Sequence, residues 1–393
     1  MSQKLIDLNP DFARLRKEGF AIEIREGFLL VHEVPYVDSA RQIKYGILVS
    51  DLSSLVAGKT VSPISQHVAY FIGAHPCNAD GTVISAIVNA SGDNQLAKNL
   101  TINHTFSNKP QSGYANYYEK IMTYVTIIAS QAQVIDEDVV IRPFKDIAQS
   151  SESSVFNYSD YNSSKAKINI ITDKLCGQKI AIIGTGGTGS YVLDLVAKTP
   201  VDEIHLFDGD IFFQQNAFRA PGAPSLEKLQ EVNKKANYLR DIYSNMRKNI
   251  IAHDYHIDSS NVDELIIMTF VFLCVDNGAA KKLIIAKLLE HKIPFIDVGI
   301  GVVRSEDILL GHVRTTTITS TKQDHLKTRI SFADGAKDDY ATNIQIADLN
   351  ALNAALAVIK WKKLFGFYHD AVGEFNSLYS INDNKLFNED FIA

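Results

Sequence analysis

Residues 179–189 read KIAIIGTGGTG, an apolar run followed at once by a glycine cluster. The run predicts a buried strand, and the cluster predicts a tight turn that opens a helix. Glycine is needed where the backbone turns sharply or where amide groups must approach a phosphate, and a helix N-terminus adds unpaired N–H groups. The pattern therefore predicts a nucleotide site at Gly184, Gly186, Gly187 and Gly189. The alternative is a glycine turn that binds nothing.

Beyond this turn, apolar runs alternate with segments of helical periodicity. Strands are expected at 179–183, 203–207, 250–253, 270–275 and 294–298, and helices at 191–198, 234–246 and 279–290. Continuous apolar strands that alternate with helices predict βαβ crossovers. The fold class is therefore predicted as α/β, with a doubly wound, Rossmann-like parallel sheet. A late helix at 349–364 is expected to pack on it through Leu349, Leu352, Leu356 and Ile359.

The first part of the chain has a different pattern. Short apolar runs separated by turn residues predict antiparallel strands at 28–34, 45–49 and 67–72. Helices are expected after Pro10 and over 114–131, where apolar residues recur at helical spacing. This part is predicted to be a smaller α+β domain.

Serine and asparagine are dense in residues 149–166, which bury little apolar surface and therefore predict a linker. We expect an N-terminal α+β domain over 1–148, a linker over 149–168 and the α/β domain, with a C-terminal helix and strands, over 169–393.

Composition argues against several classes of protein. A net charge of −6 without a basic cluster argues against nucleic acid binding. No apolar window approaches eighteen residues, and the start lacks the basic-then-apolar pattern of a secretory signal, so we expect a cytoplasmic protein with no membrane span. Three distant cysteines and eleven histidines without ligand spacing predict neither a disulfide framework nor a zinc site.

The expected second strand ends in Phe207-Asp208-Gly209-Asp210. An acid at this strand tip lies where a ribose hydroxyl pair is held, which fits NAD and ATP equally. Asn216 and Arg219 follow, and the next helix opens with Lys234-Lys235. These cations favour an enzyme that uses a triphosphate, because the leaving pyrophosphate carries the developing charge.

A later strand ends in Cys274-Val275-Asp276-Asn277, which places Asp276 at the carboxyl edge of the sheet, where open α/β sheets bind ligands. Magnesium usually takes one or two carboxylates together with phosphate oxygens. Asp276 is therefore the predicted magnesium ligand.

Each of these polar residues also has a purely structural interpretation. Asn216 could cap the segment after it, Arg219 could form a surface ion pair, and Lys235 could be a solvated helix residue. Asp276 could be a helix N-cap.

From about Lys179 to Val303 the sequence resembles the ThiF/MoeB family of adenylyltransferases, which includes the adenylation domains of ubiquitin-activating enzymes. The matching motifs are G-x-G-G-x-G, Asp208-Gly209-Asp210, Asn216-x-x-Arg219, Lys235-Ala236 and Val275-Asp276-Asn277. Lys281 stands where the family commonly carries a basic residue.

The resemblance implies that the cofactors are ATP and Mg²⁺. Asp208 would bind the ribose, and Asp210 would orient the loop or assist the metal. The implied phosphate contacts are Asn216, Arg219 and Lys235, with Lys234 as the alternative register, and Asp276 would hold magnesium.

The resemblance also implies the substrate and the partners. Family members adenylate the C-terminal glycine of a ubiquitin-like β-grasp protein and release pyrophosphate, here in a conjugation pathway of bacterial type. A homodimer is expected on the same ground.

One departure from ubiquitin-activating enzymes concerns the residue that takes the acyl group. No cysteine follows Cys274, which lies in an apolar strand and is interpreted as a core residue. The adenylate would then pass directly to a partner, or a hydroxyl such as Ser320 or Thr321 would form an oxyester with His325 as base. An exposed polar loop is the structural alternative.

The N-terminal domain contains His75-Pro76-Cys77, which resembles the active-site region of ubiquitin-conjugating enzymes, with Ser85 where that family carries its cysteine. Cys77 could accept an acyl group, or the domain could be a degenerate scaffold that docks a partner resembling a conjugating enzyme. An ordinary turn is the default.

Two other functions remain open. A nicotinamide-dependent oxidoreductase would explain the glycines and Asp208 but would leave Asn216, Arg219 and Asp276 without a role. A non-catalytic nucleotide-binding scaffold would keep the fold for partner recognition.

Overall fold

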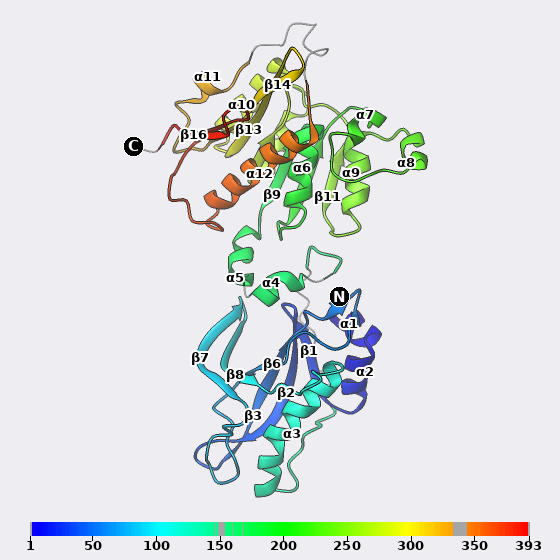
Figure 1. The fold of residues 1–393 in the computed structure, drawn as a ribbon, viewed down its shortest axis with the longest axis vertical. Coiled ribbons are helices and arrows are strands. Elements are labelled where there is room, and N and C mark those ends of the chain that lie inside the picture. The colour runs from blue at the N-terminus through cyan, green and yellow to red at the C-terminus, as the bar shows by residue number, and fades with distance from the viewer. Residues whose placement is uncertain are drawn as a thin grey trace. The chain divides into compact units, whose positions relative to one another are not determined.

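The computed structural model describes residues 2–145, 147, 154–158, 160–166, 168–332 and 344–391. The chain forms two compact units (Figure 1). Unit 1 comprises Met1–Ser154 and Tyr158–Asp173, and unit 2 comprises Val155–Asn157 and Lys174–Ala393. Of the predicted linker 149–168, residues 149–153, 159 and 167 lie outside the described residues.

Unit 1 is built on an antiparallel sheet with the strand order β1-β2-β3-β6-β8-β7. Its strands are β1 (Ala21–Arg25), β2 (Phe28–Val37), β3 (Ile43–Asp51), β4 (Leu55–Val56), β5 (Lys59–Thr60), β6 (Val68–Ile72), β7 (Val88–Ala97) and β8 (Leu100–Ser107). Its helices are α1 (Ser2–Leu8), α2 (Pro10–Lys17), α3 (Tyr117–Ile135), α4 (Tyr161–Ala166) and α5 (Asn169–Thr172).

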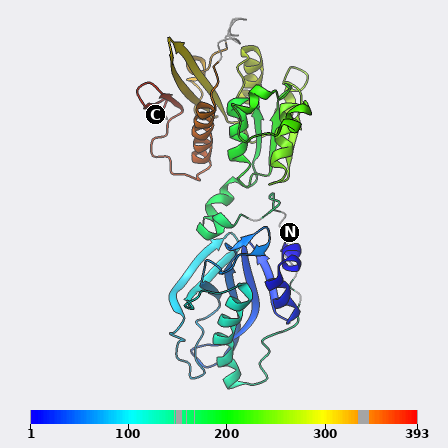
Figure 2. The ribbon, with the colours of Figure 1, turned by 45° about the vertical axis from the view of Figure 1, so that its right-hand side comes forward.

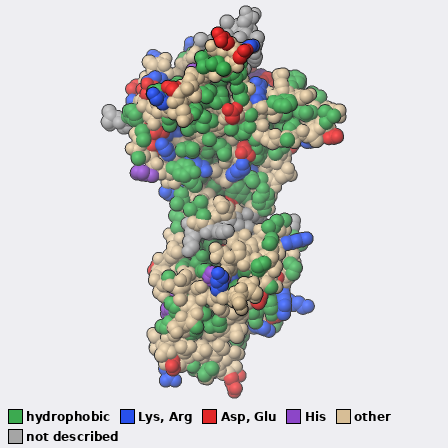
Figure 3. Space-filling model, viewed as in Figure 1, with side chains coloured by type: hydrophobic (Ala, Val, Ile, Leu, Met, Phe, Trp, Pro, Cys, Tyr) green, Lys and Arg blue, Asp and Glu red, His purple; other side chains and the backbone are tan. Residues whose placement is uncertain are grey.

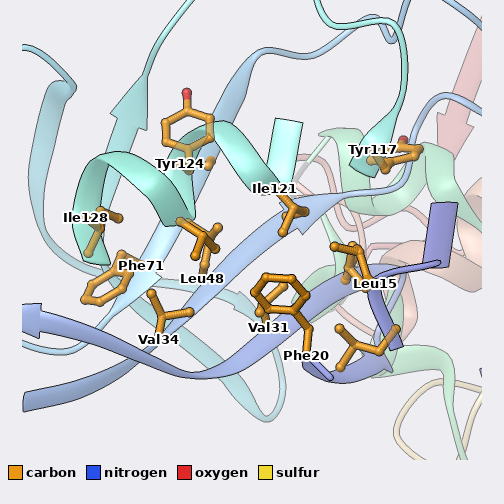
Figure 4. Close-up of a cluster of buried hydrophobic side chains, with 14 of the residues drawn as sticks. Leu15, Phe20, Val31, Val34, Leu48, Phe71, Tyr117, Ile121, Tyr124 and Ile128 are labelled. Carbon is orange, nitrogen blue, oxygen red and sulfur yellow. The ribbon is translucent and has the colours of Figure 1, made fainter. Parts of the chain in front are cut away.

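Helix α3 provides the main apolar stripe of unit 1. Its buried residues recur at helical spacing, and the helix packs on β2 and β3. In Figure 4, Ile121 and Ile128 of α3 lie over Val31, Val34 and Leu48 of the sheet. The predicted antiparallel α+β class of this domain is confirmed.

Unit 2 contains an eight-stranded sheet with the order β11-β10-β9-β12-β13-β14-β15-β16. Its strands are β9 (Lys179–Ile183), β10 (Glu203–Phe207), β11 (Ile250–His253), β12 (Phe270–Leu273), β13 (Phe295–Ser305), β14 (Ile308–Ile318), β15 (Asn376–Ser380) and β16 (Lys385–Glu389). Its helices are α6 (Gly187–Val196), α7 (Gln214–Ala217), α8 (Leu226–Gln230), α9 (Lys235–Tyr243), α10 (Gly278–Glu290), α11 (Leu326–Arg329) and α12 (Ala347–Leu364). Two 3₁₀ segments are η1 (Asp173–Leu175), at the boundary of the units, and η2 (Val262–Ile267).

The predicted doubly wound, Rossmann-like class is confirmed for the strands β9 to β13, which pair in parallel. Alternate residues of β9 enter two cores, because Ile180 and Ile182 pack with α6 and α12 while Ala181 and Ile183 pack with α10. One feature differs from the prediction. The sheet continues through β14, β15 and β16 as antiparallel strands, so it is mixed.

The buried face of α12 was predicted only in part, since Leu349 is buried and Leu352 and Leu356 pack against the same cluster, but Ile359 does not. Ile359 is 43% exposed, whereas Asn350, Asn353, Ala357 and Trp361 are buried. The helix lies beside α6 and also contacts β13 and β14, as Figures 1 and 2 show. The buried face therefore combines Trp361 with small and polar side chains, and the Leu residues pack in a separate cluster beside it.

Charged side chains of both signs are interspersed over the face of the molecule drawn in Figure 3. Among the described residues, no helix is long and apolar enough to cross a membrane.

Candidate functional site

The glycine turn joins β9 to α6, and at Gly184 its backbone accepts only glycine. Gly184 has φ +84°, and a Cβ placed there would lie 2.6 Å from the Cys274 carbonyl oxygen. Gly186 is the N-cap of α6 and provides no side-chain cap, and a Cβ at this position would meet nothing within 4 Å. Packing inside the protein therefore explains Gly184, whereas the space at Gly186 is open in front of the first turn of α6.

Asp208 directly follows β10, and its hydrogen bonds connect the end of that strand to the glycine turn. Its Oδ2 accepts hydrogen bonds from the Thr185 N–H at 2.7 Å and the Thr185 hydroxyl at 3.0 Å, and its Oδ1 accepts from the Asp210 N–H at 2.9 Å. The side chain is buried. A carboxylate offers about four acceptor positions, so these bonds leave room for about one ligand hydroxyl.

Asp210 is the more accessible of the two acids, since its side chain is 55% exposed. Its Oδ2 lies 2.7 Å from Lys235 Nζ, and its Oδ1 lies 3.4 Å from His256 Nε2. Burial raises the pKa of Asp210, but the hydrogen bond and charge of Lys235 outweigh it and hold that pKa below its usual value. The neighbouring Lys234 Nζ donates to the Gly209 carbonyl. Both lysines therefore lie at the loop that carries Asp210.

Asn216 and Arg219 lie on and just after α7. The Asn216 Oδ1 accepts a hydrogen bond from the Phe213 N–H at 2.8 Å, so Asn216 caps the start of its own helix and not the segment after it, and this bond leaves the Nδ2 group as a donor. Arg219 does not form the predicted surface ion pair among the described residues. Its Nε is buried and has no hydrogen-bond partner within that part of the chain.

One residue of the site was missed by the sequence analysis. Asn350 of α12 accepts a hydrogen bond from the Thr188 hydroxyl at 3.0 Å and donates to the Arg219 carbonyl at 3.3 Å. A Cβ at Gly187 would lie 2.2 Å from its side chain. The first turn of α6 and the main chain of Arg219 are therefore joined through Asn350. A polar residue on the buried face of a helix was the available signal.

Asp276 follows β12 at the carboxyl edge of the sheet. The turn approaches this segment closely, because Gly184 packs against Cys274 and Val275. The N-cap of α10 is Asn277, whose Oδ1 accepts from the Ala280 N–H at 2.8 Å. Asp276 is exposed and is not the cap, so the structural alternative weighed for it does not apply.

Lys281 has a buried partner. Its Nζ lies 2.9 Å from Asp297 Oδ1, and the other oxygen of Asp297 contacts Arg314 at 2.5 Å. Burial, together with the charge of Asp297, raises the pKa of the Cys274 thiol. Cys274 is therefore held as a protonated thiol beside the ion pair, which agrees with a core role.

The structure does not bring Ser320 and His325 together as a catalytic pair. Ser320 is exposed, whereas His325 is buried. The His325 Nε2 lies 3.0 Å from the Thr317 carbonyl oxygen, so this nitrogen carries the proton and donates it. The Nδ1 is buried without a hydrogen-bond partner among the described residues, and it does not reach a hydroxyl.

The Cys77 thiol of unit 1 is buried, and it donates to the His75 carbonyl oxygen at 3.3 Å. Burial, with the charges of Asp38 and Asp80, raises its pKa. A buried, protonated thiol is a poor nucleophile. Ser85 is exposed.

No group of three or more His, Cys, Asp or Glu side chains suited to a metal ion occurs within the described part of the chain. A magnesium ion that reaches the protein with a nucleotide needs only one or two carboxylates, and Asp276 supplies an exposed one.

Two family models match the chain. Residues 162–348 match the ThiF family, and residues 10–161 match a domain described as a domain of unknown function, DUF6791.

Curated relatives match over part of the chain. The ubiquitin-like modifier-activating enzyme 5 of Drosophila pseudoobscura pseudoobscura is 25% identical over 201 residues, which are 47% of this chain and 49% of that protein. The enzyme of the same name from Drosophila virilis is 27% identical over 163 residues, which are 38% of this chain and 39% of that protein. The chain thus spans about half the length of these relatives, or less.

Similar solved structures include Escherichia coli MccB with MccA-N7isoASN, at a TM-score of 0.47 and 15% identity over 60% of this chain and 73% of that one. E. coli MccB with ATP has a TM-score of 0.43 and 17% identity over 59% of this chain and 69% of that one.

The glycine turn, the two acids of β10 and the cations that follow agree with the family whose model covers this region. This match identifies residues 162–348 as a ThiF-type domain.

Proposed function

We propose that unit 2 binds ATP with Mg²⁺ at the glycine turn and adenylates the C-terminal carboxylate of a ubiquitin-like protein, with release of pyrophosphate. The observation that carries this proposal is the buried Nε of Arg219, which lacks an acceptor among the described residues. A buried donor without a partner is costly, and a phosphate oxygen is the acceptor that suits a guanidinium. The main chain of Arg219 is fixed beside the open first turn of α6 by Asn350.

The curated relatives support the substrate. Those proteins are named ubiquitin-like modifier-activating enzymes, and they match 47% and 38% of this chain. A nicotinamide cofactor would require no cations after the ribose acid, whereas Arg219, Lys234 and Lys235 all follow it here.

The geometry supports a different role for each of these groups in binding the nucleotide. The N–H groups of the first turn of α6 would bind phosphate oxygens in the open space at Gly186. Arg219 and Lys235 would neutralise the departing pyrophosphate, and the Nδ2 of Asn216 would add a donor.

Both acids of β10 would serve the ribose, in different ways. Asp210 offers an exposed carboxylate to the hydroxyl pair, while Asp208 mainly holds the turn through Thr185 and Asp210. In this proposal Asp210, which the resemblance assigned to the loop or metal, makes the larger ribose contact.

Magnesium would be held by Asp276 together with phosphate oxygens, because Asp276 is an exposed carboxylate at the carboxyl edge of the sheet. The ion would supply neutralisation of phosphate charge. Lys281 is engaged with Asp297 and would act on the site through that ion pair.

The reaction is an in-line displacement at the α-phosphorus by a substrate that is already a carboxylate. Positioning and charge neutralisation therefore suffice, and the chain needs to supply no general base. The residues of this site are donors and cations, which matches that requirement.

We further propose that the adenylate passes directly to a partner protein. Cys77 and Cys274 both have raised thiol pKa values, and His325 does not contact Ser320. Cys176 is exposed, but it precedes β9 and so lies at the amino end of that strand, opposite the glycine turn. The predicted homodimer and a partner resembling a conjugating enzyme remain predictions.

ATP–pyrophosphate exchange with candidate β-grasp proteins tests the proposal. Arg219→Ala should reduce exchange by about 100-fold, the cost of removing one preorganised donor to a developing charge. The matched control is Arg240→Ala, since the Arg240 side chain is half-buried and pairs with its neighbour Asp241 on α9. Asp276→Ala should also remove exchange, whereas Asp307→Ala, in a fully exposed turn, should not.

Exchange that survives Asp276→Ala and Arg219→Ala unchanged would count against the mechanism. Tight NAD binding without ATP binding would favour an oxidoreductase, and ATP binding without turnover with any candidate would favour a scaffold.

A further inference from the structure

Two asparagines occupy the buried face of α12, one turn apart. Asn350 and Asn353 are both almost fully buried, although a helix that packs on a core normally places apolar residues there. Neither has an assigned role. Their hydrogen bonds lead to different parts of unit 2, so the two residues can be compared directly.

Both the oxygen and the nitrogen of the Asn350 side-chain amide form hydrogen bonds beside the proposed nucleotide site. Its Oδ1 accepts from the Thr188 hydroxyl in the first turn of α6, and its Nδ2 donates to the Arg219 carbonyl. Gly187 permits this approach, because any Cβ there would lie 2.2 Å from the amide. The first turn of α6 and Arg219 are distant in sequence, and this one side chain spans them.

The side-chain amide of Asn353 instead bonds to strands β13 and β14. Its Nδ2 donates to the Gly299 carbonyl of β13 at 3.1 Å, and its Oδ1 accepts from the Thr315 hydroxyl of β14 at 3.3 Å. The two residues share residue type, helix and depth of burial, so truncation of either removes about the same packing and leaves similar buried polar groups without partners.

We propose that Asn350 is a positioning residue for ATP, which acts by fixing Arg219 and the first turn of α6 relative to each other. This inference rests on the proposed function. The Arg219 guanidinium has a buried Nε that finds no acceptor in the described part of the chain, so few contacts there fix the direction of that side chain. The hydrogen bond from Asn350 to the Arg219 carbonyl fixes the main chain from which the Arg219 side chain extends. Loss of the bond lets Arg219 move away from the phosphates that α6 binds.

The test is equilibrium binding of Mg·ATP to the full chain, with the fluorescent analogue mant-ATP as probe and thermal unfolding measured alongside. Asn350→Ala should weaken ATP binding about tenfold, the size of one charge-assisted hydrogen bond. Asn353→Ala should lower thermal stability to a similar degree but change ATP affinity less than about twofold.

A double-mutant cycle separates positioning from general destabilisation. If Asn350 acts through Arg219, then Asn350→Ala should change affinity little in the Arg219→Ala background, because the contact it supports is already gone. Thr188→Val, which is isosteric, breaks the Thr188–Asn350 bond and serves if Asn350→Ala fails to fold; it should also weaken ATP binding more than Asn353→Ala does.

Three results would overturn the inference: wild-type affinity in Asn350→Ala, equal losses in the two asparagine variants, or full additivity with Arg219→Ala. If the wild-type chain itself fails to bind Mg·ATP, the proposed function is wrong, and this inference, which rests on it, is wrong as well. The two failures are therefore distinguishable from the wild-type titration alone.

Discussion

Each unit contains a buried lysine paired with an aspartate, and the two pairs are built differently. In unit 1, Lys120 of α3 is fully buried, and its Nζ lies 2.9 Å from Ser50 Oγ and 3.7 Å from Asp51 Oδ2. In unit 2, Lys235 Nζ lies 2.7 Å from Asp210 Oδ2.

The exposure of the aspartate distinguishes the two pairs. The Asp51 side chain is 7% exposed, whereas that of Asp210 is 55% exposed. Burial outweighs the attraction of Asp51 and lowers the pKa of Lys120 to about 8. A lysine enclosed with its partner serves the fold, while a lysine whose partner faces solvent can exchange that partner for a ligand. Sequence alone does not separate these cases.

The largest effect is expected for Lys120→Ala. Removal of one member of a buried pair leaves Asp51 without its cation and opens a cavity, which should cost unit 1 about 3–5 kcal/mol of unfolding free energy. The measurement is a urea titration read by a short hydrogen-exchange pulse on α3 peptides. Trp361, the only tryptophan, lies in unit 2 and reports that unit independently.

Lys120→Met is the control for that variant, because it keeps most of the side-chain volume and removes the buried charge. We expect it to be clearly more stable than Lys120→Ala. Equal losses in both variants would show that the ion pair, and not packing, dominates.

Lys235→Ala should show the opposite pattern to Lys120→Ala, with a large effect on activity and a small effect on stability. ATP–pyrophosphate exchange should fall about 100-fold, while the stability of unit 2 changes by less than about 1 kcal/mol, since exposed Asp210 becomes solvated. Lys198→Ala, which breaks the exposed pair with Asp194 on α6, is the matched control. A large stability loss with normal exchange would make the two lysine pairs equivalent.

The two pairs should also differ in pH dependence. The pKa of Lys120 is about 8 in the folded chain and close to 10.5 when unfolded. Between these values the unfolded chain binds more protons, so the stability of unit 1 should rise with pH, by at most about 1.4 kcal/mol per pH unit. Below pH 8 both states hold the proton and the slope disappears.

Buried tyrosines of unit 1 have raised pKa values and oppose this trend near pH 10. The informative quantity is therefore the difference between wild type and Lys120→Met, followed by the same α3 pulse over pH 7 to 10. A difference that stays constant with pH would mean that Lys120 titrates normally.

The smallest effect concerns the glycine turn. Gly186→Ala should leave the stability of unit 2 within about 0.5 kcal/mol, because surface changes without clashes usually do. It should nevertheless weaken mant-ATP binding several-fold, since the methyl group enters the space open to a ligand. Gly184→Ala should destabilise the unit, because its Cβ would meet the Cys274 carbonyl. Unchanged ATP affinity in Gly186→Ala would place the phosphates elsewhere.

Much of the fold was predictable because its parallel strands are buried on both faces. The runs at β9, β10 and β11 could be read with their bounds from hydrophobicity alone. Strand β14 was not predicted and the C-terminal strands were expected only without bounds, since β14 is threonine-rich and β15 and β16 are short and partly exposed. Hydrophobic periodicity carries little signal for strands of this kind.

The candidate site was predictable where local chain geometry creates it. The glycines, Asp208 and Asp210 lie on one strand–turn–helix unit and its neighbour, so their spacing reveals them. Asn350 was missed because its contact with Thr188 joins residues 162 positions apart. The pairing of Lys281 with Asp297 was also hidden, since it joins helix α10 to strand β13.

The surroundings of the three thiols have a practical consequence. Cys176 is exposed, Cys77 is enclosed in unit 1, and Cys274 is held protonated in unit 2. A maleimide reagent should therefore modify the native chain first at Cys176, which provides a single-site attachment point for a dye. The slower rates of modification of Cys77 and Cys274 would then measure how fast unit 1 and unit 2, respectively, open.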